Sequence, residues 1–334
     1  MKNFKLSICV PTFNRSKYLD LFLSKLAQVD NKILDQIELK IYDNCSTDNT
    51  FDVIEKFNSK FHVTYKKQKE NIGGTNNVID IIQNCKGEYI WVLGDDDYVI
   101  KSNLEAFFNQ YLTNELNNNW FFVSYEDGLI NLPFDHEKIC LYFQENGLEK
   151  TILKYGSHIF GFLGSHVFSK SCLDKSFFEI DFSYNRWPHI TLLLRSNHNH
   201  IFLNQSLSVK AGDLEWDSSV WFVTLLSQIL SLDNSYFSLT TKTILMIRLT
   251  LSKTFNKHLI YSRISTNYDY KLVNQQIWNL KSGANSTITK LILSIPVFLN
   301  LLLKYIPTKL IMSIFRIKPH RIEINSNEAY SRKI

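Results

Sequence analysis

The chain has 334 residues, of which 45% are hydrophobic and 14% aromatic, and its formal net charge is +5. This composition excludes a disordered chain and allows one large domain, or one domain with an appendage. The positive charge lies after residue 280, where nine Lys and Arg accompany two acids, so the body carries 28 basic and 30 acidic residues. A body without excess positive charge is a poor polyanion binder, and we expect no nucleic-acid partner.

The chain has five cysteines, an odd number, and no two of them form a Cys-x-x-Cys pair. This spacing argues against a disulfide framework and against a zinc site, and it favours a reducing cytoplasm. The first residues run directly into a strand-like segment without a long apolar stretch or cleavage site. We therefore expect no signal peptide and a cytoplasmic location.

Short apolar strands alternate with amphipathic helices through the first hundred residues. Strands are expected at residues 6–10, 37–42, 62–65 and 89–93, and helices at 17–28, after 50 and after 74. This alternation, with short connections, predicts a mostly parallel, doubly wound α/β sheet.

Polar clusters follow three of these strands, at residues 11–15, 43–44 and 95–97. Parallel strands end at one edge of a sheet, so these clusters should converge there, as a nucleotide site requires. Asp95, Asp96 and Asp97 repel one another unless a cation or hydrogen-bond donors meet them. Mg²⁺ takes one or two carboxylates together with substrate phosphates. The alternative is a solvated acidic turn that caps the next helix.

The pattern after residue 101 is mixed. The expected elements are a helix at 102–116, a strand at 120–125, a helix at 145–155, a strand pair or bent strand at 159–168, a helix at 190–195, a strand at 200–209 and helices over 218–259.

The C-terminal segment, residues 288–315, is rich in Leu and Ile but interrupted by lysines and prolines. Its longest uncharged run, residues 291–303, is shorter than the roughly 20 residues that span a bilayer. It predicts two proline-broken amphipathic helices in a membrane interface, or alternatively a buried helical cap of the domain.

Four segments in this order resemble family-2 glycosyltransferases of the GT-A fold. They read SICVPTFNR (7–15), DNCSTDNT (43–50), NIGGTNN (71–77) and GEYIWVLGDDD (87–97). The resemblance covers about residues 4–125, and fainter features to about 210 are similar to bacterial surface-polysaccharide transferases of the abequosyltransferase-like kind. It implies a GT-A domain at 1–210, with a nucleotide-binding half at 1–125 and an acceptor half at 126–210. A helical extension at 211–285 and a basic, apolar, membrane-associating tail at 286–334 would follow.

The resemblance also implies an activity. Such an enzyme moves a sugar from a nucleotide-diphosphate sugar to an acceptor hydroxyl with inversion, usually with a divalent metal, Mn²⁺ or Mg²⁺. The acceptor would be a glycan or a polyprenyl-linked oligosaccharide of a capsule, an O-antigen or a similar polymer. The enzyme would work at the cytoplasmic face of the membrane, bound peripherally through its tail.

Carried over by position, the resemblance assigns site residues. Pro11, Thr12, Asn14 and Arg15 would border the diphosphate and base, Asp43 would contact the base, Asn71 and Gly73 would lie under the nucleotide, Asp95 would contact ribose, and Asp96 and Asp97 would hold the metal. The family pattern Leu-Asp-x-Asp-Asp has an acid where this chain has Gly94, so the division of work among the three acids stays open.

An inverting transfer needs a general base near the acceptor hydroxyl. The candidates are His189, whose ordinary pKa suits proton abstraction near neutrality, and Asp181 a little upstream. His189 could instead be a metal ligand or a helix-cap histidine.

Three other interpretations compete. Gly94-Asp95-Asp96 also resembles the Gly-Asp-Asp turn of RNA-directed polymerases, but the body lacks a basic channel. A sugar-nucleotide nucleotidyltransferase would carry a glycine-rich phosphate loop after the first strand, and residues 10–15 contain no glycine. A catalytically inactive scaffold at the membrane would explain Gly94, although retention of all three acids argues against it.

Overall fold

The computed structural model describes residues 4–113, 119–127, 136–155, 160–180, 188–196 and 199–210, with single residues at 238, 240, 241, 244 and 294. Nearly all of these belong to one compact unit, residues 1–182 with 187–215. Apart from these single residues, the predicted helices over 218–259 and the predicted tail lie outside the described residues.

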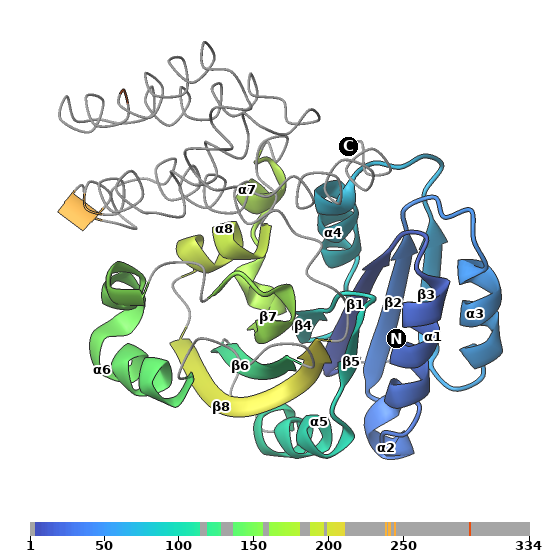
Figure 1. The fold of residues 1–334 in the computed structure, drawn as a ribbon, viewed down its shortest axis with the longest axis horizontal. Coiled ribbons are helices and arrows are strands. Elements are labelled where there is room, and N and C mark those ends of the chain that lie inside the picture. The colour runs from blue at the N-terminus through green and yellow to red at the C-terminus, as the bar shows by residue number, and fades with distance from the viewer. Residues whose placement is uncertain are drawn as a thin grey trace, which may run out of the picture. The chain divides into compact units, whose positions relative to one another are not determined.

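The unit is built on a sheet with the strand order β3-β2-β1-β4-β7-β6-β8-β5 (Figure 1). Its strands are β1 Leu6–Thr12, β2 Ile37–Asp43, β3 His62–Lys67, β4 Tyr89–Val92, β5 Asp97–Val99, β6 Asn119–Asp127, β7 His166–Ser169 and β8 Asn199–Lys210. The first four strands run parallel, with β1 between β2 and β4. The predicted parallel half of the sheet is therefore confirmed, and its strands begin and end close to the predicted positions.

Helices connect and cover the strands. They are α1 Ser16–Leu26, α2 Asn31–Leu34, α3 Thr50–Phe57, α4 Gly74–Gln83, α5 Lys101–Phe107, α6 His136–Tyr155, α7 Lys175–Phe178 and α8 Pro188–Arg195, with the short turns η1 Phe108–Leu112, η3 Leu163–Ser165 and η4 Lys170–Cys172. The predicted helix at 102–116 is thus a shorter α-helix that continues as the π-helical turn η1.

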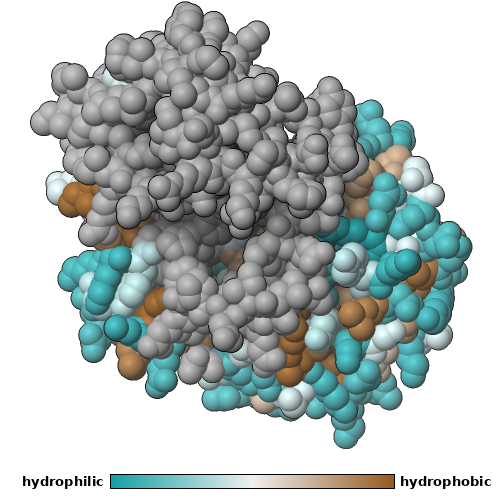
Figure 2. Space-filling model, in the orientation of Figure 1, coloured by the Kyte–Doolittle hydropathy of each residue, from teal (hydrophilic) through white to brown (hydrophobic). Residues whose placement is uncertain are grey.

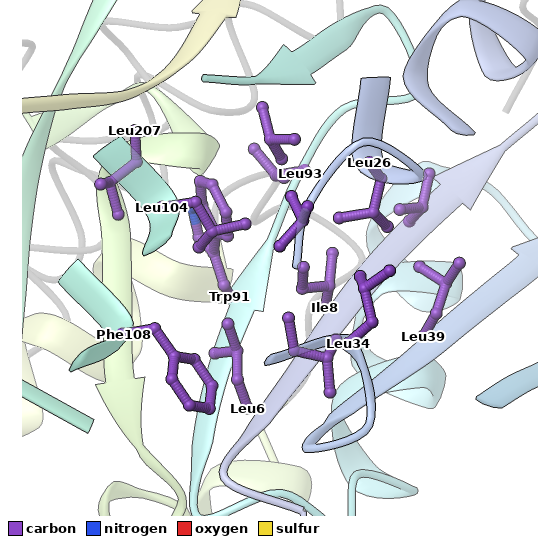
Figure 3. Close-up of a cluster of buried hydrophobic side chains, with 14 of the residues drawn as sticks. Leu6, Ile8, Leu26, Leu34, Leu39, Trp91, Leu93, Leu104, Phe108 and Leu207 are labelled. Atoms are coloured by element: carbon purple, nitrogen blue, oxygen red, sulfur yellow. The ribbon is translucent and has the colours of Figure 1, made fainter. Parts of the chain in front are cut away.

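Alternate residues of β1 face opposite sides of the sheet, as strand geometry requires. Leu6, Ile8 and Val10 point into the main apolar core, whose members from α1 and α5 are shown in Figure 3. On the other side, the sulfur of Cys9 lies 3.1 Å from that of Cys85, just after α4. Helices α1 and α4 therefore cover opposite faces, and β1, β2 and β4 are buried on both faces, whereas the edge strand β3 is partly exposed.

A buried polar network ties the parallel strands to the segment between α4 and β4. The Ser7 hydroxyl donates to Glu38 at 2.7 Å and accepts from the Gly87 N–H at 2.9 Å, and Lys86 donates its N–H to Glu38 at 2.8 Å. Each of these groups gains a partner away from water, which removes the large cost of an unpaired buried polar group.

The second half of the sheet is mixed. Strand β7 pairs antiparallel with both β4 and β6, and β8 pairs parallel with β6. The predicted strands at 120–125 and 200–209 are confirmed. The predicted strand pair or bent strand at 159–168 is wrong, because among the described residues 160–168 only those of β7 form a strand, and the 3₁₀ turn η3 precedes it. Trp91 fixes this turn by donating its indole N–H to the Gly164 carbonyl at 2.7 Å.

Helix α6 begins nine residues before its predicted start at 145. Its backbone leaves helical geometry at Gly147, where φ is 75°. Glycine takes this conformation without steric cost, so two helical stretches meet at this kink. The stretch after Gly147, which ends at Tyr155, agrees with the helix predicted at 145–155, and the stretch before Gly147 was not predicted.

The surface in view carries mostly hydrophilic side chains with apolar ones scattered among them (Figure 2). Among the described residues the exposed large hydrophobic side chains are Tyr18, Leu21, Phe51, Leu141 and Ile244. No helix within the described ranges has the length and apolar character needed to cross a bilayer.

Candidate functional site

The ends of β1 and β4 meet through a buried hydrogen bond. The hydroxyl of Thr12, the last residue of β1, donates to Oδ2 of Asp95 at 2.7 Å. The two residues are 83 positions apart in the sequence, and they meet because β1 and β4 are parallel neighbours that end at the same edge. The predicted convergence of the first and third polar clusters is therefore confirmed.

Arg15 joins this pair and adds the next acid. Its Nη1 donates to Oδ1 of Asp95 at 3.1 Å and to Oδ2 of Asp96 at 2.9 Å. The side chain of Asp95 is 6% exposed, against 18% for Asp96 and 22% for Arg15. Burial raises the pKa of Asp95 to about 6, although Arg15 and Thr12 both favour the ionised form. Asp95 is thus buried and held by Thr12 and Arg15, whereas Asp96 and Arg15 lie nearer to solvent.

A tight turn from Gly94 to Asp97 presents these acids. The Asp97 N–H donates to the Gly94 carbonyl and the Gly94 N–H donates to Oδ2 of Asp97, each at 3.2 Å. A Cβ at Gly94 would lie 2.6 Å from Oδ1 of Asp96 and 3.0 Å from Oδ2 of Asp97. The glycine therefore leaves the space into which both carboxylates fold.

The loops after β1 and β2 are bonded to each other beside the acids. Asn14, with φ of 53°, donates its N–H to the Ser46 hydroxyl at 2.8 Å, and its Oδ1 accepts the Thr47 N–H at 2.8 Å. Asparagine tolerates this left-handed conformation better than most residues. Pro11, also a predicted site residue, lies within β1 and is in register with Tyr42 of β2.

Asp43 is buried at the end of β2, and both its oxygens have partners within the protein. Oδ1 accepts the Ser46 N–H at 2.7 Å, and Oδ2 accepts the Tyr65 hydroxyl at 3.0 Å. Burial and this bond to Asp43 raise the pKa of Tyr65 well above its ordinary value. Asp43 therefore organises the loop, and its predicted contact with a base stays a prediction.

Asn71 and Gly73 lie at the entrance to α4, linked to the loop after β2. The Asn71 Oδ1 accepts from the Asn44 side-chain amide at 2.7 Å and from the Gly73 N–H at 2.9 Å, and Asn44 accepts the Ile72 N–H at 2.9 Å. Gly73 has φ of 83°, which a residue with a side chain adopts only with strain. The segment from Asn71 to Gly73 is thereby held beside the second polar cluster, residues 43–44.

The predicted metal ligands are Asp96 and Asp97. Within the described ranges no three His, Cys, Asp or Glu side chains converge to form a complete protein cage. The donors still fit Mn²⁺ or Mg²⁺, because such ions bind through one or two carboxylates plus phosphate oxygens. The space over Gly94 holds the carboxylate of Asp96 at the solvent side of the turn.

The candidate base His189 is in the first turn of α8 and is 2% exposed. Its ring centroid lies 5.0 Å from that of His166, and burial lowers its pKa well below the ordinary histidine value. His166 is also buried; it accepts from the Trp120 indole at 3.3 Å and bonds the Phe160 carbonyl at 2.7 Å. The other candidate, Asp181, lies outside the described residues.

Sequence reasoning named no role for Ser46 and Tyr65, which fix Asn14 and Asp43. The position of Ser46 was readable, since an Asp side chain commonly accepts a backbone N–H a few residues further on in a turn. The part played by Tyr65 depends on the pairing of β3 with β2, which no local pattern indicates.

The fold and the site define a class of protein, an α/β domain with a mostly parallel sheet that gathers acids, an arginine and amide side chains at one edge of that sheet. The chain belongs to glycosyl transferase family 2, because the model of that family matches residues 7–175, about half of the chain.

Two curated relatives support this membership. The chain is 28% identical over 203 residues to abequosyltransferase RfbV of Salmonella typhimurium, across 57% of this chain and 60% of that protein. It is 31% identical over 102 residues to the poly(ribitol-phosphate) beta-N-acetylglucosaminyltransferase TarS of Staphylococcus aureus, across 30% of this chain and 18% of TarS. The chain thus spans less than two thirds of these relatives.

Solved structures of S. aureus TarS 1–349 share the fold. The complex with UDP superposes with a TM-score of 0.59 at 16% identity, and the complex with UDP-GlcNAc with a TM-score of 0.58 at 16% identity. In both comparisons 90% of each chain is covered. The predicted GT-A class, a mostly parallel sheet flanked by helices, is confirmed.

Proposed function

We propose that this chain transfers a sugar from a nucleoside-diphosphate sugar to a hydroxyl of a bacterial surface glycan, with inversion and with a divalent metal. The observation that carries the proposal is the Thr12–Asp95–Arg15–Asp96 network at the strand ends of a family-2 domain. The donor class is supported by TarS, whose structures contain UDP and UDP-GlcNAc. The polymer class is supported by the names of RfbV, TarS and TuaG, a putative teichuronic acid biosynthesis glycosyltransferase of Bacillus subtilis.

The site residues supply the functions that such a transfer needs. Arg15 would bind the diphosphate, because guanidinium groups form strong, charge-assisted bonds with phosphate. Asn71, Gly73 and the loop held by Asp43 would form the floor beneath the nucleotide, together with Pro11, Thr12 and Asn14. Asp95 would orient the ribose.

The metal would be held by Asp96, with Asp97 beside it in the turn. A bound Mn²⁺ or Mg²⁺ would neutralise the charge that develops on the departing diphosphate. In the transfer, the acceptor oxygen bonds the anomeric carbon from the face opposite the diphosphate, the bond to the diphosphate breaks, and a base takes the hydroxyl proton.

The first experiment is calorimetric titration of the full chain with UDP, GDP, CDP and dTDP, each with Mn²⁺ and with EDTA. Wild type should bind one of them in a metal-dependent manner, and Asp96→Asn should lose the metal dependence. Glu88→Gln is the matched control, because Glu88 pairs with Lys5 at the opposite end of the parallel strands. Binding of none of the four by the folded wild type would refute the donor site and favour the inactive scaffold.

Cys45 provides a second test, in which nucleotide binding is followed by protection of a thiol. It lies in the loop after β2 and is partly exposed, whereas the other four cysteines are buried. A thiol reagent should therefore modify Cys45 first, and a bound nucleotide should slow that reaction. Unchanged labelling at saturating nucleotide would place the nucleotide elsewhere.

The base is proposed to be Asp181 or His189. The burial of His189 and its lowered pKa make it a weak proton acceptor, which favours Asp181. Asp181→Asn and His189→Gln should separate the two. The variant that keeps nucleotide binding but loses sugar transfer at all pH values identifies the base.

The basic, apolar tail at 286–334 is proposed to bind the cytoplasmic face of the membrane. Each Lys or Arg near an anionic surface contributes about 1 kcal/mol. The full chain should sediment with anionic vesicles but not with neutral ones. A chain that ends at residue 285 should remain in the supernatant, and its sedimentation with anionic vesicles would refute the proposal.

A further inference from the structure

Arg15 occupies a position between two acids that a bound cation would also occupy. One nitrogen, Nη1, donates to both Asp95 and Asp96. The second oxygen of Asp95 is already bonded to Thr12, and the carboxylate of Asp97 is bonded to the Gly94 N–H. Asp96 is the most exposed of the acids that Arg15 contacts, and its Oδ2 is engaged by Arg15.

We propose that Arg15 acts as an internal cation that withholds Asp96 from the metal until a nucleoside diphosphate arrives. The diphosphate draws the guanidinium to its phosphate oxygens, and the Oδ2 of Asp96 then becomes available to the metal. This inference rests on the proposed function, since it needs a diphosphate at this edge of the sheet.

The difference in burial between the two acids that Arg15 contacts supports this order of events. Asp95 is held by Thr12 and is nearly buried, so it stays in place when Arg15 leaves. Arg15 and Asp96 are both partly exposed, and an ion pair near solvent is weak. Phosphate offers the guanidinium a planar, two-point contact that a single shared nitrogen does not make with the carboxylates.

The proposal predicts that metal affinity depends on Arg15 even without nucleotide. In wild type, Mn²⁺ must displace Arg15 from Asp96 and overcome its positive charge. In Arg15→Gln that competition is absent, so nucleotide-free Mn²⁺ affinity should rise on the order of tenfold, within the usual 5–150-fold range of coupling between sites. Nucleotide affinity should fall in the same variant, because the phosphate contact is lost.

The measurement is titration of the nucleotide-free full chain with Mn²⁺, with the free ion followed by electron paramagnetic resonance. Lys5→Gln is the control, because it also removes one cation from an ion pair, with Glu88. Lys5 precedes β1, whose seven residues separate it from the site by about 20 Å. Lys5→Gln should leave Mn²⁺ affinity within about twofold of wild type, since so distant a charge is screened.

Two further variants locate the effect. Arg15→Gln/Asp96→Asn should lose the gain in Mn²⁺ affinity, because the gain comes from Asp96. Arg15→Lys keeps a cation beside the acids and should remain close to wild type without nucleotide. A gain that persists in the double variant would place the metal elsewhere and overturn the proposal.

An Arg15→Gln variant that melts at the same temperature as wild type but binds Mn²⁺ no more tightly would also overturn the proposal. If that variant fails to fold, the Arg15 Nε–H signal in the NMR spectrum of wild type provides the test, with the signal assigned by its loss in Arg15→Lys. Whichever of UDP, GDP, CDP and dTDP binds in the calorimetric titration must shift this signal when it is added without metal, and an unchanged signal at saturation with that nucleotide refutes the proposal. Absence of any nucleotide binding would instead remove the donor site itself, so the two failures are distinguishable.

Discussion

Thr12→Val tests whether the bond between β1 and β4 stabilises the site. Valine has nearly the same shape as threonine but cannot donate to Asp95, whose carboxylate is buried and accepts the Thr12 hydroxyl at 2.7 Å. A hydrogen bond to a charged group contributes about 1.5–3 kcal/mol. The free energy of unfolding should therefore fall by about 2 kcal/mol at pH 8.

Thr151→Val is the matched control. The Thr151 hydroxyl is also buried and also donates at 2.7 Å, but to the neutral carbonyl of Gly147. Loss of a neutral bond costs about 1 kcal/mol, so the two identical substitutions should differ by about that amount. Urea denaturation curves with equal slopes would measure both values.

The pH dependence strengthens the test. The pKa of Asp95 is raised to about 6 in the folded protein, and Thr12 is one of the groups that keep it from rising further. Below that pH the carboxyl is protonated, and the lost bond becomes a neutral one. The cost of Thr12→Val should therefore grow as the pH rises through 6, whereas that of Thr151→Val should stay constant. Equal costs at pH 8, or a pH-independent difference, would refute the electrostatic role of Thr12.

Three other predictions concern single residues. Cys45 has φ of 71°, so Cys45→Asn should raise the free energy of unfolding by about 0.5 kcal/mol and Cys45→Val should lower it by 1 kcal/mol or more, as measured in urea. Burial lowers the pKa of His166 to about 4, so its contribution to stability is complete above pH 6.5 and declines as the pH falls toward 4, by up to about 3 kcal/mol; NMR titration of its ring should show no protonation at pH 6. Gly94→Ala should displace Asp96 and weaken metal-dependent nucleotide binding while the fold persists, unlike Gly74→Ala, whose Cβ would meet nothing within 4 Å.

The parallel half of the fold was predictable because each of its elements carries a local signal. An apolar run indicates each central strand, a polar cluster marks its end, and the next helix has apolar residues at helical spacing. The GT-A fold class was predicted from these signals together with the resemblance to family-2 glycosyltransferases. The mixed half of the sheet was harder to predict from the sequence, because β7 pairs with β4 and β6, which are far from it in the sequence. No local pattern encodes that choice.

The sequence predicted where the residues of the candidate site lie better than it predicted which hydrogen bonds they make. Sequence reasoning brought Thr12, Arg15 and Asp95 to one edge of the sheet, and the structure joins them by hydrogen bonds. The sequence predicted that Asp43 contacts the base of the nucleotide, yet both oxygens of Asp43 already accept hydrogen bonds from Ser46 and Tyr65. Those partners become visible only when the loop geometry and the pairing of β3 are known.

The glycine at position 94, where the family pattern has an acid, allows Arg15 to contact Asp96. A side chain at this position would collide with the carboxylate of Asp96, so the glycine lets Asp96 fold over the turn toward Arg15. One guanidinium nitrogen, Nη1 of Arg15, then lies against the carboxylates of both Asp95 and Asp96. A divalent cation that replaced the guanidinium beside Asp96 would bring a larger positive charge to this partly exposed carboxylate. Removal of Arg15 should therefore strengthen metal binding at this turn, whereas removal of Asp96 should abolish it.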